Sequence, residues 1–563
     1  MTVAYFTQPI AHTRRRTTLV LGVLTLFLLL ARLRSYAEPL EWDIGMYTAI
    51  AGEMRHGERL YADAWDMKPP AIFATFAAAQ SLAGDGFLSI YLLSVIAAFV
   101  TMLGVYHAAS VAGPTAGLWA AAFWAAMAFD PWTGGDRPNT EAFINAAVAW
   151  AFALWVRGDD NDRRGWGRWI GVALLFAVAS MYKHVAVAPA AFMAVLDVGF
   201  PRASESRSRA ALRIAVMAGV GLLAWAALFA YFAATGRAWI FWQTMFVYPR
   251  AYSGGMIDNV FASWPSLQTM GRYTVFLTPA LVLLAIGACL TTRAAPRRAW
   301  LLFAGLFVGT YIAIALPGSF LSHYFQLWFV PLAIGAGWGA AALPHVPGMR
   351  APRLATCAAA LALLVIVYPQ LTFLPLNGRE RAGRKYGDFL LYGHDAAHAA
   401  RELLQPGETM FTWSEETYVY PAAGQRPPAT GLWREHMVKG PLAEWLTERT
   451  LADLRRRPPD LYLHWGAPLE TDQDHPVPQW ALERYVPLPG GNRSHFPMYI
   501  YVLKGSPLEK RLMRSSTVPT SSPPSSSPPM SSRGTPRDLG GEGAYLLRDP
   551  SGYLGMTIPR DPK

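Results

Sequence analysis

The sequence predicts a polytopic α-helical membrane protein with a small α/β domain toward its C-terminus and a disordered tail. Three observations support this fold class. Of the 563 residues, 53% are hydrophobic and only 15% are charged, whereas soluble proteins usually carry about 25% charged residues. Many apolar runs reach the roughly 20 residues that a helix needs to span the hydrocarbon core. Short loops rich in arginine separate these runs.

About eleven membrane-spanning helices are expected within a transmembrane domain at residues 1–370. A long first outer loop at residues 36–85 separates the first two helices. The expected spans are residues 18–35, 86–108, 114–130, 141–157, 168–182, 185–200, 213–233, 273–291, 299–316, 325–343 and 353–370.

The arginine-rich loops orient the helices, because loops on the cytoplasmic side of a membrane carry an excess of Lys and Arg. If the N-terminus is cytoplasmic, alternate loops hold four groups of arginines. These are Arg157, Arg163, Arg164 and Arg168; Arg202, Arg207, Arg209 and Arg213; Arg293, Arg297 and Arg298; and Arg350 and Arg353. The opposite loops are richer in Trp, Tyr and acidic residues. This topology places the first loop and everything after residue 370 on the outer face.

Residues 371–505 are expected to form an extracytoplasmic α/β domain. A helix is predicted to end in the basic turn at residues 451–457, before Pro458. Strands are predicted at residues 460–464 and 497–503, which are rich in β-branched and aromatic residues. Residues 506–563 are rich in Ser, Pro and Gly. Such a composition cannot bury a core, so this tail is expected to be disordered.

Two features exclude other classes of protein. The net charge of +11 arises from the loop arginines, and no basic stripe is interleaved with aromatic residues. No nucleic-acid partner is therefore expected. Cys289 and Cys357 both lie in apolar segments, which argues against a disulfide scaffold and against a cysteine-based metal site.

The first outer loop contains the polar residues best suited to chemistry. Residues 47–56 are predicted to form an amphipathic helix that lies in the membrane interface. Asp43 precedes this helix, and a partly desolvated carboxylate at that place can act as a general base toward a hydroxyl. The alternative is that Asp43 caps the helix and Asp66 pairs with Lys68. The apolar face holds Tyr47, Ile50, Ala51 and Met54, and the opposite face holds Glu53, Arg55 and His56.

The first outer loop also resembles that of a known family. Asp43-Ile-Gly-Met-Tyr47, followed by Asp66-Met-Lys-Pro-Pro70, is similar to the first-loop signature of GT-C fold glycosyltransferases. The similarity is to the branch that contains protein O-mannosyltransferases, the lipid A aminoarabinose transferase and bacterial family 39 relatives. Many bacterial relatives have an acidic residue directly after the aspartate, where this chain has Ile44. Its second carboxylate stands two residues earlier, at Glu41.

Further elements resemble the family in the same order, over about residues 15–505. They are Asn139-Thr140-Glu141, Tyr182-Lys183-His184, Ser322-His323-Tyr324-Phe-Gln326, and Phe411-Thr-Trp-Ser-Glu-Glu416 with Arg426-Pro-Pro428. The first three of these elements each have a simpler explanation. Thr140 suits a helix cap, Lys183 suits a lysine that reaches to the interface, and the His323–Tyr324 pair suits an aromatic belt.

The resemblance implies an enzyme of the bacterial cytoplasmic (inner) membrane. It would move a sugar from a polyprenyl-phosphate donor to a hydroxyl or phosphate of a glycan, lipid or protein acceptor at the outer face. We expect Asp43 to deprotonate the acceptor, and Lys183, His184 and Arg250 to hold the donor phosphate. The catalytic candidates are Asp43 and Glu41. The candidates for substrate or lipid-phosphate binding are Asp66, Lys68, Arg137, Glu141, Lys183, His184, Arg250, His323 and Tyr324. A divalent cation near Asp43 stays open, although no ligand cluster of recognisable spacing demands one.

A lipid or solute transporter, or a flippase, is the main alternative. Ion-coupled transporters usually place charged groups near the middle of the membrane and show repeated halves. The predicted spans contain almost no acid or base at mid-span, and the sequence contains no internal repeat. A non-catalytic scaffold is a third class. The large outer loops and the outer domain favour the enzyme.

Overall fold

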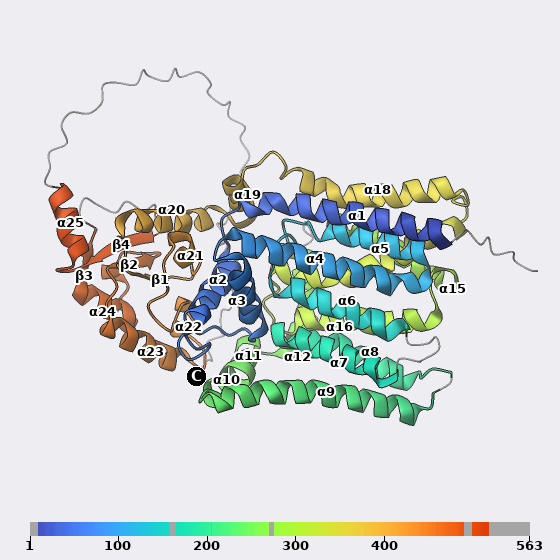
Figure 1. Ribbon diagram of the computed structural model, residues 1–563, viewed down its shortest axis with the longest axis horizontal. Helices are drawn as coiled ribbons and strands as arrows, with labels where there is room; N and C mark the ends of the chain where they lie inside the picture. The colour runs from blue at the N-terminus through green and yellow to red at the C-terminus, as the bar shows by residue number, and fades with distance from the viewer. Residues whose placement is uncertain (1–9, 158–164, 204, 270–274, 489–497, 517–563) are drawn as a thin grey trace, which may run out of the picture.

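The computed structural model describes residues 10–157, 165–203, 205–269, 275–488 and 498–516. Long helices run side by side in a bundle, and the C-terminal region with its strands covers one end of it (Figure 1). Helices α2 (Trp42–Arg55) and α3 (Ala71–Ala83) lie between the bundle and this region. We call this end of the bundle the domain end.

Each of the eleven expected spans coincides with a helix. These helices are α1 (Ile10–Tyr36), α4 (Phe87–Ala109), α5 (Pro114–Met127), α6 (Thr140–Val156), α7 (Gly165–Tyr182), α8 (Ala188–Gly199), α9 (Arg207–Ala234), α14 (Thr278–Cys289), α16 (Arg297–Ala315), α17 (Phe329–Ala342) and α18 (Pro352–Leu371). Six segments of the described chain are long and apolar enough to cross a membrane. They are Arg14–Tyr36, Phe87–Ala112, Arg207–Ala234, Arg297–Ala315, Ser322–His345 and Pro352–Leu371.

Shorter helices connect the bundle at its two ends. They are η1 (Ser110–Ala112), η3 (His184–Val187), α10 (Ala238–Trp242), η4 (Gln243–Val247), α11 (Tyr248–Ser253), α12 (Met256–Thr269), η5 (Val275–Leu277), α15 (Thr291–Ala294), η6 (Ser322–Trp328) and η7 (Leu343–His345).

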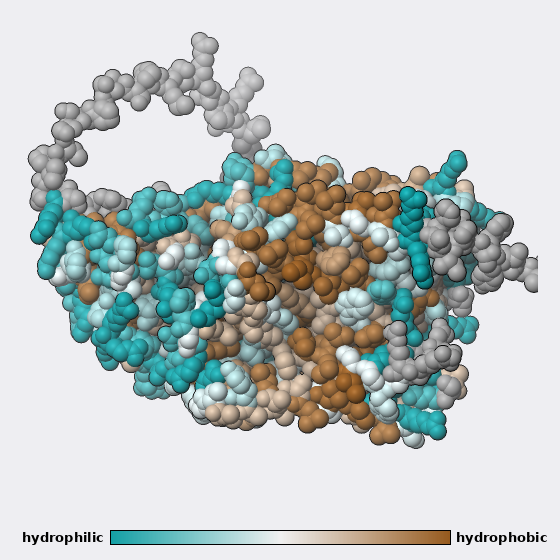
Figure 2. Space-filling view, viewed as in Figure 1, coloured by the Kyte–Doolittle hydropathy of each residue, from teal (hydrophilic) through white to brown (hydrophobic). Residues whose placement is uncertain are grey.

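The surface and the packing of the bundle both fit a membrane. Hydrophobic residues cover the middle of the bundle, and hydrophilic residues gather at both ends (Figure 2). Leu222 and Leu223 of α9 are more than 70% exposed, as lipid-facing side chains would be. Inside the bundle, small residues allow helices to approach closely. A Cβ at Gly309 of α16 would lie 2.4 Å from the Cα of Pro189 in α8.

The C-terminal region contains a four-stranded sheet in the order β1-β2-β4-β3. Strand β2 pairs with β1 in parallel and with β4 antiparallel, and β3 pairs antiparallel with β4. The two predicted strands and the predicted helix end at residue 457 are confirmed within about one residue. The elements are α19 (Gly378–Tyr386), α20 (Asp388–Leu403), β1 (Met410–Trp413), α21 (Val419–Ala423), α22 (Arg434–Val438), α23 (Ala443–Arg456), β2 (Leu461–Trp465), η8 (Leu469–Thr471), α24 (Pro476–Arg484), β3 (Tyr485–Pro487), β4 (Met498–Leu503) and α25 (Pro507–Ser516).

The first outer loop departs from its prediction. Helix α2 is more deeply buried than a helix in the membrane interface would be, since ten of its fourteen residues are buried, although Arg55 and His56 of the predicted polar face are exposed. Glu53, expected on the polar face, is only 5% exposed and accepts two hydrogen bonds of 2.7 Å from Arg426 of the C-terminal region. The alternation of polar and apolar residues is real. It belongs to a helix that protein covers over most of its surface, with the buried carboxylate of Glu53 paired.

The first residues of the predicted disordered tail are ordered. Residues 507–516 form α25, where Leu508 is fully buried and Arg511 pairs with Glu408 at 2.8 Å. The buried side chain of Leu508 and this ion pair anchor the segment to the rest of the C-terminal region. Residues 517–563 lie outside the described residues.

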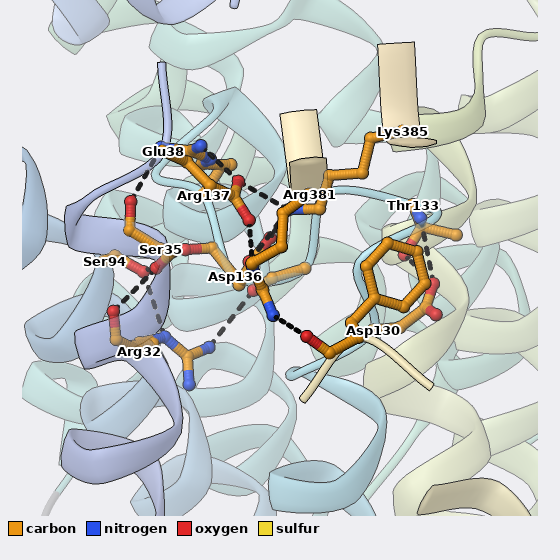
Figure 3. A network of polar contacts seen from close by, with 12 residues as sticks. Arg32, Ser35, Glu38, Ser94, Asp130, Thr133, Asp136, Arg137, Arg381 and Lys385 are labelled. Carbon is orange, nitrogen blue, oxygen red and sulfur yellow. Dashed lines mark hydrogen bonds and ion pairs between the residues drawn. The ribbon is translucent and has the colours of Figure 1, made fainter. Parts of the chain in front are cut away.

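A buried ion network joins the bundle to the C-terminal region (Figure 3). Glu38, just after α1, pairs with Arg137 of the α5–α6 loop and with Arg381 and Lys385 of α19. Asp136 pairs with the same two α19 residues, at 3.5 and 3.0 Å. The side chains of all five residues are at most 4% exposed. The network therefore holds the two parts together through paired charges that are shielded from water.

A glycine at the same junction provides a test of this packing. A Cβ at Gly45 of α2 would lie 2.3 Å from the Cβ of Tyr418 and 2.5 Å from its Cα. We expect Gly45→Ala to lower the free energy of unfolding by about 1–3 kcal/mol or more, because backbone must move to relieve the clash. Gly52→Ala on the same helix meets nothing within 4 Å and should be neutral or slightly stabilising. Equal thermal unfolding of the two purified variants would contradict the close contact.

Candidate functional site at the domain end of the bundle

An open cavity of about 820 Å³, counted to its solvent mouth, lies where the bundle meets the C-terminal region. The α2–α3 loop, the α7–η3 junction, α11, η6 and α22 all contribute to its wall. The lining residues are Asp43, Asp66, Met67, Lys68, Pro69, Lys183, His184, Val185, Pro249, Tyr252, Ser253, Pro317, Leu321, His323, Tyr324, Trp433, Glu435 and His436.

Asp43 lies in the first turn of α2 and is only 3% exposed. Its Oδ1 accepts a hydrogen bond of 3.0 Å from the Lys68 ammonium, and its Oδ2 accepts one of 3.0 Å from the Asn139 amide. The Nε2 of His323 lies 3.6 Å from the same Oδ2. Burial alone would raise the pKa of Asp43, but Lys68, then His323 and Asn139, hold this pKa well below its ordinary range. Asp43 is therefore an ionised carboxylate facing the cavity.

A second ion pair stands beside the first. Lys183 lies directly after α7 in extended backbone, and its ammonium is 2.8 Å from Oε1 of Glu141. The other oxygen of Glu141 accepts a hydrogen bond of 2.9 Å from Thr140. Glu141 occupies the first turn of α6, where the helix dipole favours a negative charge. The Lys183 ammonium also lies 3.3 Å from the centre of the Tyr324 ring, which fixes its position at the cavity wall.

Asp66 lies in the α2–α3 loop and is fully buried. Its Oδ2 accepts a hydrogen bond of 3.2 Å from the backbone N–H of Lys68. The Lys68 ammonium bonds Asp43. The side-chain pair between Asp66 and Lys68, which was the alternative explanation of these residues, is therefore replaced by a contact with the Lys68 backbone. Burial raises the pKa of Asp66, while Lys68 opposes this rise.

The structure brings most of the predicted site residues together. Seven of them line the cavity: Asp43, Asp66, Lys68, Lys183, His184, His323 and Tyr324. Glu141 joins them through its ion pair with Lys183. The element at residues 139–141 starts a helix as its simpler explanation proposed, but the cap is Asn139 and not Thr140.

Three predicted residues lie elsewhere. Glu41 caps α2, where its side chain accepts from the N–H groups of Asp43 and Ile44, and burial together with the Asp43 charge raises its pKa to about 7. Arg137 is held in the ion network of Figure 3. Arg250 is exposed at the end of α11. The sequence shows the charge of these three residues and their approximate depth in the membrane, and both match those of the cavity residues. It does not show the direction of each side chain, which decides whether the residue reaches the cavity.

Sequence reasoning missed the contribution of the C-terminal region. Trp433, Glu435 and His436 belong to α22 or directly precede it, and all three line the cavity. Some 370 residues separate them from Asp66 in the chain, so their place beside it depends on the tertiary structure. Asn139 was noted only as part of a family element, and its contact with Asp43 depends on the folding of α6 against α2.

Two carboxylates at and beside the cavity are paired with ammonium groups. No group of three His, Cys, Asp or Glu side chains that could hold a metal is found among the residues that the structure describes. Asp43 and Glu141 each bind an ammonium group, and an ammonium repels a metal ion at the same oxygens.

Comparison with protein families finds one match. Residues 67–232 match the family model described as dolichyl-phosphate-mannose-protein mannosyltransferase. This range begins beside Lys68 and includes Asn139, Glu141 and Lys183. No curated protein sequence matches the chain.

Solved structures share the fold. ArnT from Cupriavidus metallidurans bound to undecaprenyl phosphate aligns with a TM-score of 0.55 and 16% identity, over 86% of this chain and 97% of ArnT. The same protein in the apo state aligns with a TM-score of 0.54 and 15% identity, over the same shares of the two chains. The archaeal oligosaccharyltransferase AglB from Archaeoglobus fulgidus, in complex with an inhibitory peptide and a dolichol-phosphate, aligns with a TM-score of 0.51 and 13% identity. It covers 89% of this chain and 77% of AglB.

Proposed function

We propose that this chain is a GT-C fold glycosyltransferase related to the protein mannosyltransferases and ArnT, and that it moves a sugar from a polyprenyl-phosphate donor to an acceptor. The acceptor group is a hydroxyl or a phosphate of a glycan, lipid or protein. One observation carries the proposal: Asp43, Lys68 and Lys183 meet at a single cavity at the domain end of the bundle. The binding of undecaprenyl phosphate by ArnT and of a dolichol-phosphate by AglB supports a lipid-phosphate donor.

The two lysines suit the leaving group. Sugar transfer breaks the bond between the anomeric carbon and the phosphate oxygen, so negative charge develops on the polyprenyl phosphate. A unit charge 4 Å from an ammonium gains about 4 kcal/mol at an effective dielectric of 20, before desolvation. Lys68 and Lys183 would stabilise this charge in the transition state. A phosphate of this kind leaves without a proton, so no general acid is needed.

Asp43 is the proposed general base. The acceptor O–H would transfer its proton to Asp43 as its oxygen bonds to the anomeric carbon. In the absence of donor, Lys68 makes Asp43 a weak base by lowering its pKa. A donor phosphate competes for Lys68, so the pKa of Asp43 would rise when the donor is bound. The base would thus gain strength when the substrate is present.

The side of the membrane follows from the loop arginines. With the N-terminus in the cytoplasm, the domain end and its cavity would face outward from the bacterial inner membrane, and the C-terminal region would be extracytoplasmic. A cysteine-labelling experiment on membrane vesicles of known orientation tests this. In a variant with Cys289→Ser and Cys357→Ser, a single cysteine introduced at exposed Lys439 should react only with reagent on the outer side.

A transporter or flippase is the alternative, and incubation with a labelled polyprenyl-phosphate sugar separates the two. An enzyme moves the label to a new acceptor, whereas a flippase moves the intact lipid between leaflets. The charged groups of the cavity lie at the ends of α6 and α7 and in loops, and not at mid-span. This placement favours an enzyme.

Removal of the Lys183 ammonium should lower transfer strongly. We expect Lys183→Ala to reduce kcat/KM by about 10²-fold, since one charged contact to the transition state is lost. The substitution also leaves Glu141 buried without its partner, which destabilises the fold. The double variant with Glu141→Gln removes this second effect and serves as the control. If the double variant regains wild-type transfer, Lys183 is structural and does not bind the phosphate.

A further inference from the structure

Two polar atoms face each other in the cavity without a hydrogen-bond partner in the described part of the chain. They are Oδ1 of Asp66 and Nε2 of His436, and they lie 3.8 Å apart. The two residues are 0% and 7% exposed, and both line the cavity. A separation of 3.8 Å is too long for a hydrogen bond. Buried polar atoms usually have partners, so this pair is suited to a group that enters from the cavity.

The environment of His436 determines which of its nitrogens carries the hydrogen. Burial, together with Lys68 and Lys439, lowers the pKa of His436 to about 3, so the ring is neutral. Its Nδ1 lies 2.7 Å from the hydroxyl of Tyr248, whose pKa burial raises. With Tyr248 donating to Nδ1, the hydrogen is on Nε2. The opposite tautomer would direct the lone pair of Nε2 at the carboxylate of Asp66 and is disfavoured.

The gap therefore presents one donor and one acceptor. Nε2–H of His436 can donate, and Oδ1 of Asp66 can accept, because its other oxygen is used by the Lys68 backbone. A hydroxyl has both functions. An oxygen about 2.8 Å from each atom fits a pair 3.8 Å apart, slightly off the line that joins them.

Aromatic rings pack around His436. The ring centroids of Trp65, Trp433 and Tyr248 lie 5.2, 5.4 and 5.5 Å from that of His436. Trp433 lines the cavity. Ligand sites commonly combine such apolar walls with a few convergent polar groups, and the C–H face of a sugar ring suits an aromatic wall.

We propose that Asp66 and His436 form a hydroxyl-binding subsite for the sugar of the donor, so that the C-terminal region takes part in sugar selection. The inference rests on the proposed function, in which Lys68 holds the donor phosphate. Asp66 is two residues from Lys68 and is bonded to its backbone, so a sugar attached to that phosphate lies next to the subsite. The acceptor would approach Asp43, which Lys68 contacts with its ammonium group.

Binding measurements on the full chain in lipid nanodiscs test the subsite. The probes are bare undecaprenyl phosphate and its mannosyl, glucosyl and arabinosyl derivatives. We expect the best-bound sugar lipid to bind the wild type more tightly than the bare lipid phosphate. His436→Ala should raise the Kd of that sugar lipid by about 5- to 100-fold, the effect of leaving one buried polar group unpaired. It should leave the Kd of the bare lipid unchanged. His436→Gln, whose amide can place an N–H near the position of Nε2, should restore part of the loss.

A matched control is His475→Ala. His475 is a half-buried histidine of the same region that contacts Thr447 and the Met437 carbonyl and does not line the cavity. It should leave both Kd values unchanged. If His436→Ala raises the Kd of the bare and the sugar-bearing lipid equally, or changes neither, the proposed subsite is wrong while the proposed function stands. If none of the lipids binds to the wild type, the proposed function fails as well.

Discussion

Replacement of Asp43 by asparagine should lower sugar transfer by about 10²–10⁴-fold, the contribution typical of a general base. Asparagine keeps the size of the side chain and its contact with Asn139, but it cannot take the proton of the acceptor. The folded state should persist, since α2 keeps its cap at Glu41. The measurement is single-turnover transfer of label from a polyprenyl-phosphate sugar in purified membranes, alongside thermal unfolding of the same preparation.

Asp63→Asn is the matched control for this prediction. Asp63 lies in the same loop, pairs with Arg59 at 2.8 Å and is remote from the cavity lining. Its conversion to the amide should change neither transfer nor unfolding by more than the small effect of an exposed ion pair. Should Asp43→Asn retain more than about a tenth of wild-type transfer, the role of Asp43 as base would have to be abandoned.

Replacement of Glu38 by glutamine should destabilise the protein by about 3–5 kcal/mol, the cost of leaving buried charges without their partner. Glu38 accepts from Arg137, Arg381 and Lys385 (Figure 3). Without the charge of Glu38, Arg381 and Lys385 keep Asp136 as a partner, and Arg137 loses its ion pair with Glu38. Chemical unfolding in mixed micelles measures the loss. The variant should also expose the C-terminal region to protease, because the network joins that region to the bundle.

The matched control is the exposed pair of Arg379 and Asp395, which also lies in α19 and α20. Its side chains are 52% and 27% exposed, so Asp395→Asn should cost no more than about 1 kcal/mol. A loss of similar size in both variants would contradict the importance of burial in the network.

The same network predicts how stability depends on pH. Burial would raise the pKa of Glu38, but Lys385, Arg137 and Arg381 outweigh it and lower the pKa from 4.5 to about 2. A carboxylate whose pKa is lower in the folded state stabilises the fold above its unfolded pKa. That stabilisation is lost as the pH falls from about 4.5 to about 2. Glu38→Gln should remove this acid-dependent part of the unfolding curve.

Several parts of the fold were predictable because they depend on local composition. The eleven helices lie where the apolar runs are, and the strands at β2 and β4 lie where β-branched and aromatic residues gather. Asp43, Lys68 and Lys183 could be nominated because short motifs of recognised spacing contain them. Glu41 and Arg250 have the right residue type and lie near the right end of the bundle, but their side chains cap a helix or face solvent.

The sequence by itself determined that this protein lies in a membrane, how its helices are ordered and which polar motifs gather at one end. Apolar length and charge placement act through solvation, which each segment experiences largely on its own. Only the tertiary structure decided that the Lys68 ammonium bonds Asp43, that Arg137 lies in the ion network with Glu38, and that His436 reaches the cavity. These contacts join residues that are 25 to several hundred positions apart, and their geometry is set by the packing of α2 between the bundle and the C-terminal region.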